Sequence, residues 1–300
     1  MSTFMMLDSA AMADGFRHMT FPAFRDLLDF DPAKRAPLAV GARVNEHPVG
    51  LALAAPTGAP GGGELLSLYV DQDYRRRGVA GELMRQTLAA CAARGAAEIS
   101  ATYMSGQAGT AAVERIFESS GWDAPETRML VVRCSLESIK AAPWLNRFTV
   151  PPGYEVLPWV EVGAAERAAI RDSHAHKPWV ATDLMPFDFE QGIEPITSVA
   201  LRVKGEILGW CLNHVVGDVL RYTCSFVRRD LQRLGRILLL YNEAVARMPA
   251  AGMSVGMWTV PVGHAGMMSF ARKHMQPYSI FFGETRGVKI RLAQSGQGPT

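Results

Sequence analysis

The chain has 300 residues, which is enough for two domains with separate hydrophobic cores. Its 31 basic and 29 acidic side chains give a net charge of +2, so a broad surface for nucleic acid or membrane is not expected. Hydrophobic residues make up 48% of the chain, as in globular proteins, and no apolar run is long enough to span a membrane.

The four cysteines show neither the close pairing of a disulfide framework nor the spacing of metal ligands. We therefore expect reduced thiols and no bound metal. Residues 1–14 lack the basic region and apolar core of an export signal. These features together predict a cytoplasmic location.

The first predicted elements are strands. Residues 39–52 have the pattern of a strand, a tight polar turn and a second strand. A glycine-rich loop at 58–63 then leads to a strand at 64–70. The order of these elements predicts a sheet that begins with antiparallel neighbours.

A basic turn joins the strand at 64–70 to a helix, and this order predicts an anion site. The first turn of a helix leaves backbone N–H groups without intrahelical partners and carries the positive end of the helix dipole. Gly78, Ala80 and Gly81 keep side chains away from a ligand at the helix start. The three arginines at 75–77 supply guanidinium groups that suit phosphate oxygens.

Arg75-x-x-Gly78-x-Ala80 resembles the Gln/Arg-x-x-Gly-x-Gly/Ala motif with which GCN5-related N-acetyltransferases bind the pyrophosphate of acetyl-coenzyme A. Residues 116–122 resemble the helix end and glycine–aromatic step of the same family. The resemblance implies an α/β (α+β) fold with a central mixed, mostly antiparallel β-sheet flanked by helices. It also implies that acyl-coenzyme A contacts Leu68, Tyr69, Val70, Arg75, Arg76, Arg77, Gly78, Val79, Ala80, Gly81 and Phe117.

Acyl transfer to an amine needs a base, because the ammonium form is not nucleophilic. Glu64 opens the strand before the basic turn, where histone-type members of the resembled family carry a general-base glutamate. Burial between apolar neighbours raises the pKa of a carboxyl group toward working pH and makes it a better base. The alternative is a solvated carboxylate at the rim of an edge strand, with a structural role.

The departing thiolate of coenzyme A benefits from a proton donor. Many family members supply a tyrosine on the helix before the glycine–aromatic step, where this chain has Phe117. Tyr103 and Ser105, which follow a strand at 98–102, are the nearest candidates for the donor. Two alternatives stay open: the thiolate leaves into water, or these residues belong to an ordinary loop and turn.

The second half of the chain repeats the first. Residues 39–52 align without gaps on residues 198–211, and the strand, turn and helix around Arg75 recur around Gln232. Two strands at 278–282 and 288–292 are expected to close the second half, as residues 129–136 close the first. A period this long indicates a duplicated domain.

The duplication predicts two tandem domains of the same fold. We place the first at residues 1–140 and the second at 154–300, with a linker at 141–153 in which three prolines interrupt regular structure. We expect the first domain to bind acyl-coenzyme A and to carry the catalytic residues.

The second copy departs from the motif at two places. Ile237 and Leu238 replace the small residues at the helix start, and a β-branched side chain there obstructs close approach by a ligand. Arg221 stands where the first copy has Glu64. We therefore expect a degenerate domain that shapes the acceptor site.

The sequence predicts an acyl-coenzyme A-dependent N-acyltransferase. Its expected substrates are acetyl-coenzyme A and a small amine or amino-acid-like metabolite, with direct attack on the thioester and no nucleic-acid or membrane partner. One alternative is acetylation of a protein or peptide, which Glu64 favours. Another is a non-catalytic sensor or scaffold that binds acyl-coenzyme A, which Phe117 favours.

Overall fold

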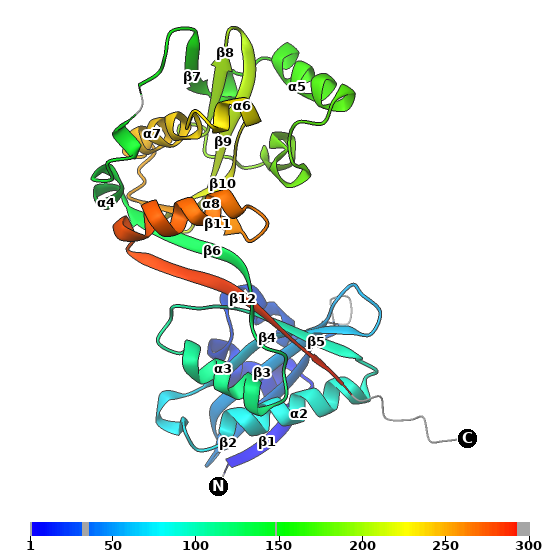
Figure 1. Ribbon diagram of the computed structural model, residues 1–300. Helices are drawn as coiled ribbons and strands as arrows, with labels where there is room; N and C mark the ends of the chain where they lie inside the picture. The colour runs from blue at the N-terminus through cyan, green and yellow to red at the C-terminus, as the bar shows by residue number, and fades with distance from the viewer. Residues whose placement is uncertain (1, 32–35, 148, 293–300) are drawn as a thin grey trace. The chain divides into compact units, whose positions relative to one another are not determined.

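The computed structural model describes residues 2–31, 36–147 and 149–292, and its contacts divide the chain into two units (Figure 1). The first unit contains the residues up to Arg128 and those from Thr285 on, and the second contains Met129–Glu284. The first unit is thus discontinuous in sequence. The expected domain boundary at residue 140 differs from this division, because the chain enters the second unit within a strand that begins before Met129.

The first unit is a mixed, mostly antiparallel sheet. Its parallel pair is formed by β4 and β5, and its other neighbours pair antiparallel. In spatial order the strands are β1 (Ser2–Leu7), β2 (Leu38–Val44), β3 (His47–Pro56), β4 (Gly62–Val70), β5 (Glu98–Met104) and β12 (Phe281–Arg291). The helices are α1 (Ala10–Ala13), α2 (Val79–Ala93) and α3 (Thr110–Ser119), with 3₁₀-helices at Asp14–Met19, Pro22–Asp29 and Gln72–Tyr74.

Successive residues of β3 supply two hydrophobic cores on opposite faces of this sheet. Leu51 and Leu53 pack with residues of α1 and of the 3₁₀-helices that follow it. Ala52 and Ala54 pack with residues of α2 and α3. Because helices cover both faces, β3 is buried over most of its length.

The second unit repeats this arrangement. Its parallel pair is β10 and β11, and its other neighbours pair antiparallel. In spatial order the strands are β7 (Tyr154–Pro158), β8 (Val199–Val203), β9 (Glu206–Val216), β10 (Val219–Val227), β11 (Val255–Pro261) and β6 (Glu126–Ser135). The helices are α4 (Leu136–Lys140), α5 (Ala164–His176), α6 (Arg229–Gln232), α7 (Ile237–Arg247) and α8 (Ala265–Phe270), with a π-helix at Ala271–Met275 and 3₁₀-helices at Leu145–Arg147, Trp159–Glu161, Thr182–Leu184, Pro186–Phe189 and Gln276–Tyr278. The predicted fold class is confirmed.

The repeated hairpins agree in backbone detail. The first turns through Asn45 and Glu46, with φ of 47° and 66°, and the second through Lys204 and Gly205, with φ of 49° and 89°. Two successive residues with positive φ are what a type I′ turn requires, and this turn matches the twist of the two strands that it joins.

A glycine shared by both copies marks a close approach of two strands. A Cβ on Gly209 would lie 2.6 Å from Cγ1 of Val227 and 2.9 Å from the carbonyl oxygen of Phe226. A Cβ on Gly50 would lie 3.1 Å from the carbonyl oxygen of Tyr69. Strand β9 therefore needs a residue without a side chain at this position, and strand β3 leaves little room for one.

Gly209→Ala is expected to lower the free energy of unfolding of the second unit by about 1–3 kcal/mol, because the added methyl group overpacks β9 against β10. Urea unfolding monitored by tryptophan fluorescence measures the change. Gly263→Ala is the matched control, since its Cβ would meet no atom within 4 Å. Equal stabilities of the two variants would contradict the steric explanation.

The prediction of which strand comes last in each sheet is wrong. Residues 129–135 of β6 do not close the first unit but pair with β11 in the second. Residues 281–291 form one continuous strand, and its part from Thr285 to Arg291 pairs with β5 in the first unit. A strand's own pattern specifies which face is buried, but it does not identify which of two similar sheets the strand joins.

All four cysteines are free and buried. Burial raises the pKa of the Cys91 thiol to about 11 and that of the Cys134 thiol to about 12, so both stay protonated at neutral pH. Within residues 2–31, 36–147 and 149–292, no helix has the length and hydropathy needed to cross a membrane. The same residues contain no cluster of three or more His, Cys, Asp or Glu side chains placed to hold a metal ion.

Candidate functional site

The basic turn of the first unit leads directly into α2. Gly78 is the N-cap of the helix with φ of 79°, and Arg76 has φ of 61°, so the backbone turns sharply before the helix begins. The Nε atom of Arg75 donates a hydrogen bond to the carbonyl oxygen of Val70 at 3.0 Å. This bond ties the turn to the end of β4, and Arg75, Arg76 and Arg77 are all exposed.

The backbone amides along this turn are available to a ligand. No N–H group from Arg76 to Gly81 donates a hydrogen bond to another described residue. A Cβ added at Gly78 or Gly81 would meet no atom within 4 Å, so the space in front of the turn is open. Free amides, the positive end of a helix of 15 residues and exposed guanidinium groups are together suited to binding an anion.

The corresponding turn of the second unit keeps the shape but loses these donors. Nε2 of Gln232 donates to the carbonyl oxygen of Val227 at 2.8 Å, as the arginine does in the first turn, and Gly235 again has a positive φ of 66°. Here, however, backbone N–H groups donate to carbonyl oxygens within the turn itself, at Leu234, Gly235, Arg236 and Leu238. The second turn therefore offers fewer free donors to an anion than the first.

In each unit the two parallel strands separate at the same place. Strands β4 and β5 pair as far as Leu65 and Ala101, and strands β10 and β11 pair as far as Tyr222 and Trp258. A bulge in β4 and in β10 follows immediately. We call the place where each pair separates the fork. Past it the facing backbone groups of the two strands no longer bond each other.

Leu68, Tyr69 and Val70 follow the fork of the first unit. Each pairs with a residue of β3, whereas the pairing of β4 with β5 has ended. The edge of β4 that faces β5 can therefore hydrogen-bond an extended, amide-containing chain. These residues also lead into the turn at Arg75, so the fork and the anion site are continuous.

Glu64 lies one residue before the fork of the first unit. It pairs with Ala55 of β3 and with Ser100 of β5, so its strand is interior and the alternative of an edge strand is wrong. Its neighbour Leu65 belongs to the core under α2. Because side chains alternate along a strand, the half-buried carboxyl group of Glu64 lies on the opposite face of the sheet.

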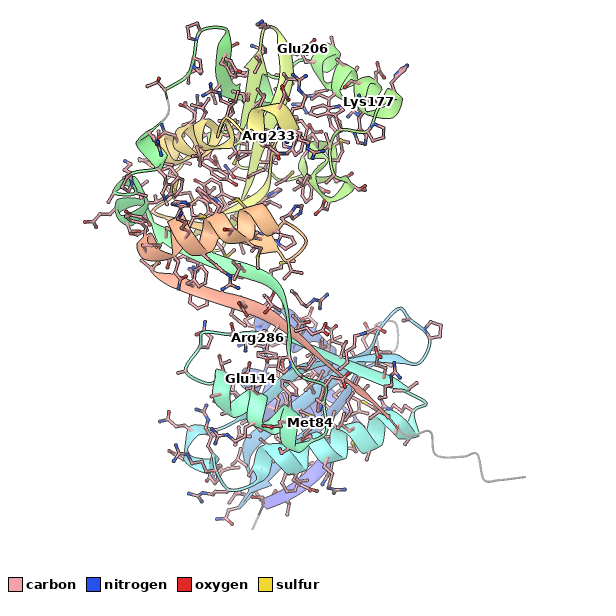
Figure 2. The ribbon with its side chains drawn as sticks, in the orientation of Figure 1. Met84, Glu114, Lys177, Glu206, Arg233 and Arg286 are labelled. Atoms are coloured by element: carbon pink, nitrogen blue, oxygen red, sulfur yellow. The ribbon has the colours of Figure 1, made fainter. Side chains whose placement is uncertain are left out.

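Tyr103 is hydrogen-bonded within the first unit. Its hydroxyl donates to Oε1 of Glu114 at 2.8 Å. Nη1 of Arg286 donates to the same oxygen at 2.7 Å, and Figure 2 labels Glu114 and Arg286. Desolvation, and then the Glu114 carboxylate, raises the pKa of Tyr103 well above its ordinary value. The hydroxyl is thus a weaker acid than that of an exposed tyrosine. Ser105, the other candidate donor, is buried.

Phe117 is a core residue with little surface for a ligand. Its side chain is 4% exposed, and its ring centroid lies 5.5 Å from that of Tyr103 and 4.9 Å from that of Trp122. The structure thus brings Phe117 and Tyr103 together, on the face of the sheet that α2 and α3 cover. Glu64 lies on the other face.

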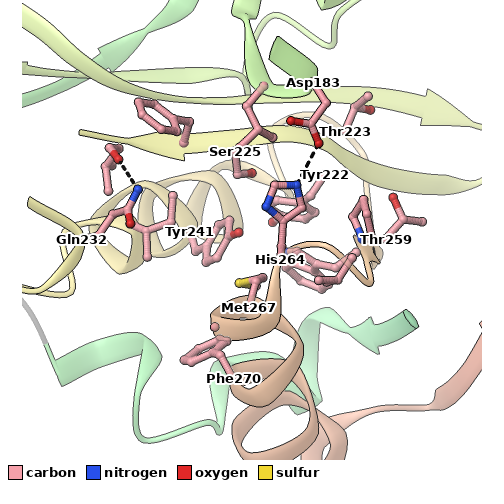
Figure 3. Close-up of a pocket in the computed structure, with 18 of the residues that line it drawn as sticks. Asp183, Tyr222, Thr223, Ser225, Gln232, Tyr241, Thr259, His264, Met267 and Phe270 are labelled. Atoms are coloured by element: carbon pink, nitrogen blue, oxygen red, sulfur yellow. Dashed lines mark hydrogen bonds and ion pairs between the residues drawn. The ribbon is translucent and has the colours of Figure 1, made fainter. Parts of the chain in front are cut away.

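The second unit contains a cavity of about 670 Å³ at its fork, which the sequence did not predict (Figure 3). Aromatic rings form part of its wall: Tyr222 and Trp258 are stacked with centroids 4.1 Å apart, and Tyr241 meets both edge-on. His264 also lines the cavity, and its Nε2 lies 2.8 Å from Oδ2 of Asp183. The two residues are 81 positions apart, so no local pattern could have joined them.

Comparison with known proteins gives a family for the first unit and a fold for the whole chain. The model of the acetyltransferase (GNAT) family matches residues 5–117. A tandem GNAT protein from the clavulanic acid biosynthesis pathway shares 15% identity, with 99% of this chain and 100% of that chain covered and a TM-score of 0.58. A GCN5-related N-acetyltransferase from Sphaerobacter thermophilus shares 16% identity, with 96% of each chain covered and a TM-score of 0.59. Among curated proteins, no sequence matches the chain.

Proposed function

Because this chain is a tandem-domain member of the GCN5-related N-acetyltransferase superfamily, we propose that it transfers the acetyl group of acetyl-coenzyme A to the amine of a small, amino-acid-like molecule. Membership of the superfamily indicates an acyl-coenzyme A-dependent N-acyltransferase. The observation that carries the choice of site is the turn of the first unit, where the backbone amides from Arg76 to Gly81 are free. Buried, unpaired thiols support a reducing compartment such as the cytoplasm.

The proposed mode of binding uses the turn and the fork together. The pyrophosphate accepts hydrogen bonds from the free amides at the start of α2, and the exposed guanidinium groups of Arg75, Arg76 and Arg77 add charge-assisted bonds. The amide-containing arm then runs along the open edge of β4, past Val70, Tyr69 and Leu68. This path leads the thioester to the fork.

In the proposed reaction Glu64 is the general base. The carboxylate takes a proton from the ammonium group of the acceptor, directly or through a water molecule. The free amine attacks the thioester carbon, so that a carbon–nitrogen bond forms, the carbon–sulfur bond breaks, and the nitrogen releases its extra proton to water. The position of Glu64, one residue before the fork and half-buried, supports this role.

The departing thiolate has no favoured donor in the first unit. The hydroxyl of Tyr103 already donates a hydrogen bond to Glu114. Its raised pKa also makes transfer of its proton to the thiolate less favourable. Ser105 is buried. We therefore propose that the thiolate leaves into water, and that Tyr103 instead orders the Glu114–Arg286 contact.

A second candidate function is a sensor that binds acyl-coenzyme A without turnover. The buried Phe117 favours this alternative, because a phenylalanine cannot donate a proton to the departing thiolate. An assay of thiol release with a panel of small amines and peptides separates the candidates. Turnover with a small amine supports the enzyme, turnover with peptides alone supports protein acetylation, and tight binding without turnover supports the sensor.

The double variant Arg75→Ala/Arg77→Ala is expected to raise the KM for acetyl-coenzyme A by about 10²-fold, with little change in the KM for the amine. Each charge-assisted hydrogen bond contributes roughly 1.5–3 kcal/mol, and a factor of ten corresponds to about 1.4 kcal/mol. Steady-state kinetics measures both constants. Calorimetry on the unaltered protein is expected to give one coenzyme A per chain.

The matched control is Arg229→Ala/Arg233→Ala, which removes two exposed arginines at the turn of the second unit. Its KM for acetyl-coenzyme A should equal that of the unaltered protein. A stoichiometry near two would show that the second unit also binds coenzyme A. A rise in KM confined to the control would move the site to the second unit, and either result would overturn the assignment.

A further inference from the structure

The cavity at the fork of the second unit has the size and wall of a ligand site. Its volume of about 670 Å³ lies within the range of small-molecule pockets in proteins. Besides the aromatic rings, its lining includes Leu184, Phe189, Phe226, Leu238 and Phe270. A wall of this kind favours the apolar body of a ligand.

Coenzyme A is a poor match to this cavity. The amides of the adjoining turn already donate to carbonyl oxygens of the chain, so a pyrophosphate would find few donors there. Ile237 and Leu238 line the cavity at the place where the first unit has small residues. The ligand of the cavity is therefore expected to lack a pyrophosphate.

The cavity also presents hydrogen-bond donors that have no acceptor. Arg221 lines it, and the Nε atom of Arg221 is buried without a partner among the described residues. The indole Nε1 of Trp258, a second lining residue, is also buried and unpaired. Burial without an acceptor is unfavourable for both groups, and a ligand that brings carboxylate oxygens removes this cost for the guanidinium group.

The acidic group of the cavity does not compete for Arg221. Asp183 is the acid among the lining residues, and its carboxylate is bonded to His264. Arg221 itself lies on the strand between Leu220 and Tyr222, which both face the core under α7, so its side chain is on the opposite face. The first unit has the acid Glu64 at the equivalent place, and the two units thus present opposite charges.

We propose that the cavity of the second unit binds a carboxylic acid with an apolar body, whose carboxylate pairs with Arg221. The site is separate from the one proposed for coenzyme A and does not depend on it. An aryl or branched-chain group of such an acid packs against Leu184 and Phe189, which line the cavity and belong to the core on the face of the sheet that Arg221 shares.

Calorimetry with 3-phenylpropionate on the full chain tests the proposal, with 3-phenylpropanamide and 3-phenylpropylamine as matched neutral and cationic probes. The acid is expected to bind with a stoichiometry of one, and about 10–100-fold more tightly than the amide. Saturating acetyl-coenzyme A should leave its Kd unchanged. Equal affinity for acid and amide, tighter binding of the amine, no binding of the acid, or competition by acetyl-coenzyme A would each overturn the proposal.

Two variants locate the site. Arg221→Gln is expected to remove the preference for the acid over the amide, whereas Arg228→Gln, whose arginine is bonded to Asp230, should keep it. Met267→Trp fills the cavity from α8 and is expected to weaken binding of all three probes (Figure 3). Circular dichroism confirms that each variant is folded. Unchanged binding of the acid in folded Arg221→Gln or in folded Met267→Trp would show that the acid binds elsewhere.

Discussion

Glu64→Gln is expected to lower kcat by about 10²–10⁴-fold, the range that loss of a general base produces. The amide keeps the size of the side chain and its place between β3 and β5, so the sheet is not disturbed. The KM for acetyl-coenzyme A should stay nearly constant, because the carboxyl group lies before the fork and away from the basic turn. The loss should shrink as the pH rises, since more of the amine is then free without help from a base.

Glu98→Gln is the matched control for this experiment. Glu98 begins β5 and is bonded to Lys289 on the surface, several residues before the fork. Its kcat should not change by more than a small factor. Full activity of Glu64→Gln at neutral pH would show that Glu64 is structural and that the base is water or another group.

Gly78→Val is expected to reduce kcat/KM for acetyl-coenzyme A by about 10²–10⁴-fold, chiefly through KM. Gly78 has φ of 79°, a conformation that a β-branched residue adopts only with strain of roughly 1–3 kcal/mol. The turn then shifts, and its amides lose alignment with the pyrophosphate. The new side chain also occupies the open space in front of α2.

The other end of the same helix provides the control. Gly95 has φ of 82°, and a Cβ there also meets no atom within 4 Å, so Gly95→Val introduces similar strain far from the amides of the turn. Both variants should lose similar stability in urea unfolding, but Gly95→Val should keep its KM for acetyl-coenzyme A. Equal kinetic losses in the two variants would show that strain alone, and not a ligand at the turn, explains the effect.

Local patterns in the sequence predicted much of the fold and the turn. The repeat, the two hairpins and the basic turn that leads into α2 each depend on residues near one another in the chain. Turn geometry and helix ends are fixed by such neighbours, so they can be recognised without a structure. The sequence also predicted a difference between the two turns, from the larger residues Ile237 and Leu238, but it did not predict that the amides of the second turn bond within the turn.

Features that depend on distant residues were not predicted. Asp183 meets His264, and Glu114 meets Arg286, only after the sheets have formed. Strand β6 pairs with β11, and tertiary contacts, not its own sequence, determine which of the two similar sheets it joins. The cavity at the second fork likewise results from how several side chains pack, which no single segment specifies.

The position of β12 has a consequence during synthesis on the ribosome. Val288 of this strand is buried in the core of the first unit, yet it is translated after all of Met129–Glu284. At about 5–20 residues per second, the ribosome needs roughly 8–30 s to make that stretch. For this interval the nascent first unit has its basic turn but an unfilled edge at β5, which is where a chaperone or a strand from another chain would bind.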